Sequence, residues 1–139
     1  FVIVMKLNNK ELESFHKIIE RFSYIKYILI TDIDGVVVSK KINKQNSVDD
    51  NLTKDLKSMS YAINSAYNQL MKVDRKELQS VTSFYDEYIL FQSKISKNFL
   101  LLILSDIKNS SMQTIREISK DIKSNLDVSS INAIYIEEN

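Results

Sequence analysis

Apolar residues recur every three or four positions in three parts of the chain, which is the period of an α-helix with one buried face. The pattern predicts a first helix over residues 9–22 and a longer one over roughly 52–72. A last helix is expected to begin at Ser110 or Ser111, because either serine can cap it. We expect the apolar stripe of the long helix to cover the chain's own sheet. The stripe consists of Leu52, Leu56, Met59, Ile63, Ala66 and Leu70.

Shorter apolar runs lie between these helices and have the length of β-strands. The predicted strands cover residues 25–32, 36–42, 78–85, 88–95 and 99–105. Strands that are joined by turns of two or three residues must pair antiparallel. The last of the five is apolar almost throughout, without the alternation expected of a strand that has one face in water. Both faces of the sheet must therefore be covered.

The predicted elements follow the order α-β-β-α-β-β-β-α, and three amphipathic helices are available as covers. This order predicts an α/β fold, a three-layer α/β/α sandwich around a five-stranded antiparallel sheet. The polar residues 43–51 predict a mobile loop between the second strand and the long helix. At 139 residues and 44% hydrophobic, the chain is expected to form a single domain over 1–139, with 1–8 and 128–139 as peripheral tails.

Composition excludes several kinds of functional site. The chain has no cysteine, so a disulfide, a zinc–thiolate site and a catalytic thiol are all excluded. Its only histidine, His16, excludes a metal site built from several imidazoles. Nineteen basic residues against eighteen acidic ones give a formal charge of +1, which is no electrostatic signal for nucleic acid. We expect a soluble intracellular protein that has no cofactor, no metal and no nucleic-acid partner.

The segment 28–38 carries the strongest motif, because two apolar runs flank the sequence Asp32-Ile33-Asp34-Gly35. Gly35 is the only glycine in the chain, and a tight strand connection uses glycine where the backbone needs a positive φ. An apolar strand ending in Asp-x-Asp-Gly resembles the first motif of haloacid-dehalogenase-type phosphatases. In that family the first Asp is the nucleophile and the second the acid/base. A hairpin with the same sequence resembles the roadblock (dynein light chain) family, whose members are scaffolds.

The phosphatase alternative needs more than this motif. Such magnesium-dependent enzymes have a parallel, doubly wound sheet with a helix after the nucleophile strand, and further acidic residues that hold the metal. Here the apolar run after Gly35 continues directly as a strand, and Asp and Gly are also the residues that a hairpin turn requires. The roadblock family, which has the predicted order of elements, accounts for more of the chain. Asp32 and Asp34 remain the catalytic candidates of the less favoured alternative.

A second segment, residues 83–92, narrows the resemblance within the roadblock family. It is similar to the third hairpin of the MAPK-scaffold type of subunit in the late-endosomal Ragulator complex, with Tyr85, Tyr88 and Gln92 in register. The likeness covers about residues 9–127, although prolines expected near this hairpin are absent. The resemblance implies a non-enzymatic scaffold or adaptor that forms a heterodimer with a second roadblock subunit, or a homodimer in isolation.

The same resemblance implies partners and a location. Ras-like (Rag) GTPases and components of the TOR and MAP-kinase pathways would bind the complex. The chain would be cytoplasmic and peripheral to the late endosome or lysosome, held at the membrane only indirectly through a lipidated anchor subunit. The alternatives are a dynein-associated or GTPase-regulating roadblock homodimer and, less favoured, a longin-like trafficking subunit.

Roadblock domains resemble one another in pairing through the long middle helix and the edge strand that follows it. Tyr67 and Met71 lie about 60–100° around that helix from its apolar stripe. Tyrosine and methionine are enriched at the cores of interfaces. The alternative is that both residues only widen the contact within the chain. The candidates for a partner interface are Met59, Ile63, Tyr67, Leu70, Met71, Val81 and Tyr85.

Overall fold

The computed structural model describes residues 9–43, 50–70 and 78–126. This part of the chain forms helices and strands in the predicted order α-β-β-α-β-β-β-α. The elements are α1 (Asn9–Arg21), β1 (Ile25–Asp32), β2 (Val37–Ile42), α2 (Asp50–Leu70), β3 (Ser80–Phe84), β4 (Tyr88–Lys94), β5 (Phe99–Asp106) and α3 (Met112–Asn125). Ser111, one of the two predicted caps, is the N-cap of α3, and its side chain accepts a hydrogen bond from the backbone N–H of Thr114.

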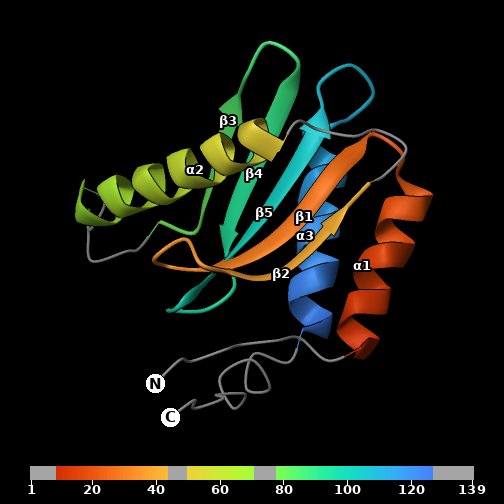
Figure 1. Cartoon of the computed structure of the whole chain (residues 1–139), viewed down its shortest axis with the longest axis horizontal. Coiled ribbons are helices and arrows are strands. Elements are labelled where there is room, and N and C mark those ends of the chain that lie inside the picture. Colours follow the sequence, from red (N-terminus) through yellow and green to blue (C-terminus); the bar gives the residue numbers. More distant parts are fainter. Residues whose placement is uncertain (1–8, 44–49, 71–77, 127–139) are drawn as a thin grey trace.

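The strands form one five-stranded sheet in the order β2-β1-β5-β4-β3 (Figure 1). Every neighbouring pair is antiparallel. The predicted five-stranded antiparallel sheet is therefore confirmed. The sheet leaves two edges, β2 and β3, and β3 is the strand that directly follows the long helix.

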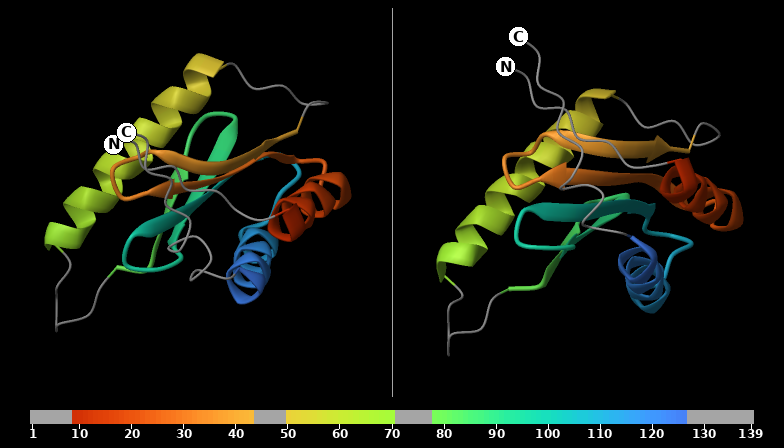
Figure 2. Two further views of the ribbon diagram at one scale, coloured as in Figure 1. Left: turned by 60° about the horizontal axis from the view of Figure 1, so that its bottom comes forward. Right: turned by 90° about the horizontal axis from the view of Figure 1, so that it is seen from below.

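The helices cover the two faces of the sheet unequally, with α1 and α3 together on one face and α2 alone on the other (Figure 2). The core under α1 and α3 includes Phe15, Ile28 and Ile118. The core under α2 is smaller and includes Leu56 and Leu29. This arrangement is the predicted three-layer α/β/α sandwich.

The strand β5 explains why both layers of helices are needed. Its residues are apolar from Phe99 to Leu104, and all of them are buried. Because side chains alternate along a strand, Leu101 and Ile103 face α1 and α3 while Leu102 and Leu104 face α2.

The connection after β2 differs from the prediction at both of its ends. Asn43 was expected in a mobile loop, but it is buried, and its side-chain amide donates to the backbone oxygens of Ser23 (3.2 Å) and Ile25 (3.1 Å). The helix α2 begins at Asp50, within the segment predicted as loop. Between these ends, residues 44–49 lie outside the described part of the chain.

Candidate partner interface

The Asp-x-Asp-Gly motif forms the hairpin between β1 and β2. One carboxylate oxygen of Asp32 accepts hydrogen bonds from the backbone N–H groups of Asp34 (2.8 Å) and Val36 (2.9 Å). Gly35 has φ of +84°, and its N–H donates to the backbone oxygen of Asp32 at 3.1 Å. Asp32 is thus the residue that shapes this turn, a role for which Asp side chains are favoured.

The architecture around Asp32 differs from the one that the phosphatase alternative requires. The strand after the motif pairs antiparallel with β1, whereas those enzymes need a helix there and a parallel sheet. In residues 9–43, 50–70 and 78–126, no group of three or more acidic or histidine side chains is placed to hold a metal ion. The role of the motif in this structure is to form the turn of a hairpin, as the roadblock resemblance predicts.

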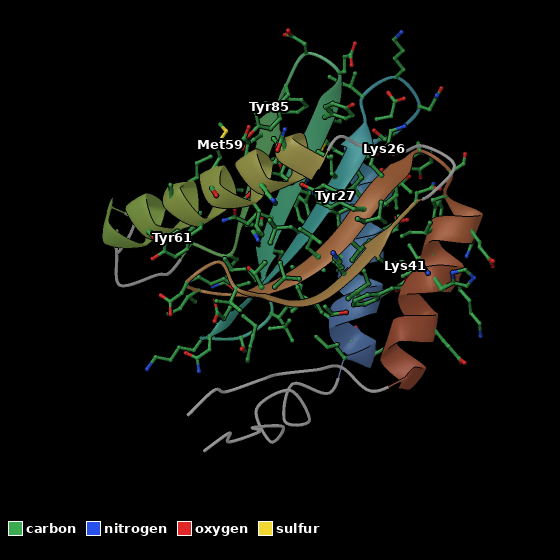
Figure 3. The ribbon with its side chains drawn as sticks, viewed as in Figure 1. Lys26, Tyr27, Lys41, Met59, Tyr61 and Tyr85 are labelled. Atoms are coloured by element: carbon green, nitrogen blue, oxygen red, sulfur yellow. The ribbon has the colours of Figure 1, made fainter. Side chains whose placement is uncertain are left out.

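A second surface, where α2 lies beside the end of β3, contains described candidates for a partner interface. Met59 on α2 is 45% exposed, and its Sδ lies 3.8 Å from the hydroxyl of Tyr85, which donates to it (Figure 3). Met59 was predicted as an interface residue from the long helix, and Tyr85 from the strand that follows it. The structure brings them into contact.

The register of the edge strand decides which of its side chains share the face of α2. Val81 is paired with Gln92, which in turn is paired with Leu102 in the core under α2. Val81 is therefore on the α2 face and half-buried. Phe84 is paired with Ile89, a member of the opposite core, and is 64% exposed. The edge β3 thus carries apolar side chains on both of its faces.

The long helix is rotated relative to the predicted stripe. Leu56 is buried as expected, but the next buried position is Ser60, and Met59 faces outward. The prediction that Met59 covers the chain's own sheet was wrong, and its exposure leaves it available to a partner. Ile63 is half-buried.

Three of the seven candidates are not placed. Tyr67 and Leu70 belong to α2, but their side chains lie outside the described part of the structure, and Met71 lies beyond the described end of that helix. The assignment of these three residues to an interface, like that of the other four, stays a prediction.

Other exposed apolar residues were not among the candidates. One of them is Phe84 on β3. Ile33 and Val36 are exposed at the β1–β2 turn, and Tyr61 on α2 is exposed near it (Figure 3). A turn normally consists of polar residues, so the apolar Ile33 within the Asp-x-Asp-Gly motif and the apolar Val36 directly after it were the signal in the sequence.

Polar atoms are buried beneath α2 without partners. Within the described residues, the Tyr27 hydroxyl, Ser60 Oγ and Gln92 Nε2 have no hydrogen-bond partner. Burial, together with the nearby Tyr85 hydroxyl, raises the pKa of Tyr27 well above its ordinary value of 10.0. Since unpaired buried polar groups cost free energy, these atoms mark positions where an apolar replacement could stabilise the protein.

The sequence model of the family described as "mitogen-activated protein kinase kinase 1 interacting" matches residues 9–132, which is most of the chain. The chain belongs to this family. Among curated protein sequences, none matches it. The family assignment and the roadblock fold together support a scaffold or adaptor role.

Solved roadblock structures are similar to this member of the family in fold. The gliding protein MglB from Thermus thermophilus has a TM-score of 0.77 at 14% identity, with 95% of this chain and 98% of that chain covered. MglB from Myxococcus xanthus gives 0.67 at 18% identity, covering 84% and 90%. A roadblock/LC7 domain from Streptomyces avermitilis gives 0.63 at 16%, covering 81% and 91%. At these identities the likeness establishes the roadblock fold.

None of the helices in the described part of the chain combines the length and apolar character needed to cross a bilayer.

Proposed function

We propose that the chain is a non-enzymatic scaffold that pairs through α2 and β3 with a second roadblock-fold subunit. The observation that carries this proposal is the contact between Met59 on α2 and Tyr85 at the end of β3, which makes the helix and the sheet edge one surface. An edge strand offers its backbone N–H and C=O groups to another strand, and a partner that pairs there also removes the exposed edge. The half-exposed Met59 and the half-buried Val81 supply apolar area on that surface.

We further propose that the paired scaffold binds Ras-like GTPases and supports TOR and MAP-kinase signalling at late endosomal or lysosomal membranes. The family description refers to interaction with a mitogen-activated protein kinase kinase, which supports the proposed role in MAP-kinase signalling. The hairpin sequence around Tyr85 and Tyr88, similar to that of Ragulator scaffold subunits, supports the membrane location. On this proposal a separate anchor subunit holds the complex at the membrane.

The first test uses the purified chain as bait in cytosol from its source organism, followed by identification of the bound proteins. We expect a second small roadblock-type subunit together with a Ras-like GTPase. The double variant Met59→Glu plus Val81→Glu is expected to lose the roadblock subunit, because it places charge at the centre of the proposed surface. The matched control is Lys97→Glu, an exposed residue in the turn between β4 and β5, which belongs to neither α2 nor β3.

Other results of this capture would replace the proposal. A monomeric chain that captures no roadblock protein would overturn the pairing. A chain that forms homodimers and recovers dynein intermediate chain would favour the dynein-associated alternative. Self-assembly has a precedent within the fold, since one MglB structure is described as having a tetrameric arrangement.

A further inference from the structure

Residues of α1 and α3, together with Phe22 after α1, line a groove. Both helices lie on the face of the sheet opposite α2 (Figure 2). Its volume is about 230 Å³. It is separate from the α2–β3 surface proposed for pairing, so a partner could occupy it while that surface is covered. Its walls and floor are formed by Lys17, Ile18, Arg21, Phe22, Thr114, Glu117, Ile118 and Asp121.

The two walls of the groove carry opposite charges. Lys17 and Arg21 lie one turn apart on α1, and Glu117 and Asp121 lie one turn apart on α3, so each pair forms a row along its helix. All four side chains are exposed. Within the described residues no ion pair joins one row to the other. The walls therefore face each other with their charges available to a third element.

Two of these side chains have contacts within their own walls. The Arg21 guanidinium lies 5.1 Å from the centre of the Phe22 ring, which is a cation–π distance. Glu117 Oε1 accepts a long hydrogen bond of 3.5 Å from Gln113 on its own helix. Neither contact neutralises a charge.

The floor between the walls is apolar and large enough for side chains of a protein. Ile118 is buried, and Ile18 and Phe22 are half-buried. A cavity of about 150 Å³ already holds a benzene-sized group, whereas sites for drug-sized molecules begin at about 300 Å³. The groove falls between these sizes, which suits one or two apolar side chains of a protein better than a small-molecule ligand.

We propose that this groove is a second docking surface, which receives an amphipathic helix of a partner protein. The helix places apolar residues spaced by three or four positions on the floor. Acidic residues along one of its edges pair with Lys17 and Arg21, and basic residues along its other edge pair with Glu117 and Asp121. A scaffold needs more than one binding surface, and this groove adds one that does not compete with pairing through α2 and β3.

The test uses three synthetic peptides of about 18 residues, long enough to form a helix on binding. All three have the same leucine stripe. The first has glutamates along one edge and lysines along the other, the second has glutamates along both edges, and the third has lysines along both. Binding of each labelled peptide to the full chain is measured by fluorescence anisotropy at low salt. We expect the mixed peptide to bind about tenfold more tightly than either of the others, because only it meets opposite charge on both walls.

A charge-reversed groove provides the decisive comparison. In the variant Lys17→Glu plus Arg21→Glu both walls are acidic, so the preference is expected to move to the peptide with lysines on both edges. The matched control reverses Lys97 and Lys108, two exposed lysines outside the groove, and should keep the original preference. Circular dichroism of each variant confirms that its fold is unchanged.

The remaining outcomes overturn the proposal. Equal binding of the three peptides, or a preference that does not move in the charge-reversed variant, would exclude this groove as the docking surface. The result is independent of pairing, since Met59→Glu should leave peptide binding intact while it weakens pairing. Conversely, the charge-reversed groove should leave capture of the roadblock subunit intact.

Discussion

The hydroxyl of Tyr85 lies 3.8 Å from the Sδ of Met59, a contact between residues 26 positions apart. It joins the outer side of α2 to the end of the edge strand β3, on the face where α2 is the single covering helix. Met59 can make this contact because it is not used in the core. One turn of α2 therefore serves two purposes, with Leu56 and Ser60 against the sheet and Met59 at the surface.

This division of roles predicts different effects of two substitutions on α2. Leu56→Ala is expected to lower the free energy of unfolding by about 2–5 kcal/mol, because it removes a fully buried side chain. Met59→Ala should change it by less than about 1 kcal/mol, since Met59 is 45% exposed. Urea unfolding followed by circular dichroism measures both. Equal losses would show that Met59 supports the core and that the rotation of α2 described above is wrong.

The fold could be predicted because its determinants are local in the sequence. The apolar run of β5 requires cover on both faces, and the short turns on either side of β4 require antiparallel pairing. Likewise, the hairpin at Gly35 follows from the only glycine of the chain. Each of these properties is set by residues within a few positions of one another.

What the sequence could not determine depends on distant contacts. The rows Leu56–Met59–Ile63 and Leu56–Ser60–Ile63 both fit a helical period, and only packing against the sheet selects the second. Asn43 was assigned to a loop because it begins a polar segment. Its burial depends on backbone oxygens 18 and 20 residues away, which the local sequence does not reveal. The exposure of Phe84 follows from the place of β3 at the sheet edge.

The β1–β2 hairpin predicts a difference between its two aspartates. Asp32→Ala removes the acceptor of two backbone N–H groups and should cost about 1–3 kcal/mol of unfolding free energy. Asp34 is exposed, so Asp34→Ala should stay within about 0.5 kcal/mol of the parent. Thermal and urea unfolding of both variants provide the measurement. If the two variants lost the same stability, Asp32 would not be the residue that shapes the turn.

A third variant separates backbone conformation from packing in the same turn. A Cβ at Gly35 would have its nearest neighbour, the Cβ of Tyr61, at 4.0 Å, which is an ordinary contact. The cost of Gly35→Ala should therefore come from its φ of +84° and amount to about 1–2 kcal/mol. Gly35→Asn should cost less, because Asn tolerates this region of φ better. Equal costs for Ala and Asn in urea unfolding would contradict an explanation based on φ.

The unpaired hydroxyl of Tyr27 predicts a substitution that stabilises the protein. Tyr27→Phe keeps the buried ring and removes a polar atom that has no partner within the described residues. We expect the free energy of unfolding near neutral pH to rise by about 1 kcal/mol. Tyr24→Phe is the matched control, because the Tyr24 hydroxyl is hydrogen-bonded to Thr114 and its removal should give no gain. A loss of stability in Tyr27→Phe would mean that the hydroxyl has a partner after all.

The same residue predicts how stability depends on pH above neutrality. Burial raises the pKa of Tyr27 in the folded protein, whereas the unfolded chain ionises near the ordinary value of 10.0. Above about pH 10 the unfolded state therefore binds fewer protons than the folded state, and the free energy of unfolding falls as pH rises. The slope approaches about 1.4 kcal/mol per pH unit for one such group.

Unfolding in urea at pH 8, 9, 10 and 11, with and without Tyr27→Phe, measures this contribution. The pKa values of Tyr24 and Tyr85 are also raised by burial. The free energy of unfolding of the variant should therefore still fall somewhat above pH 10. Only the parent has the Tyr27 hydroxyl, so only the parent loses stability through its ionisation in the unfolded state. The difference in unfolding free energy between Tyr27→Phe and the parent should therefore be constant up to pH 9 and widen above pH 10. Parallel curves over the whole range would mean that Tyr27 reaches solvent in the folded protein, and that α2 does not close over the sheet.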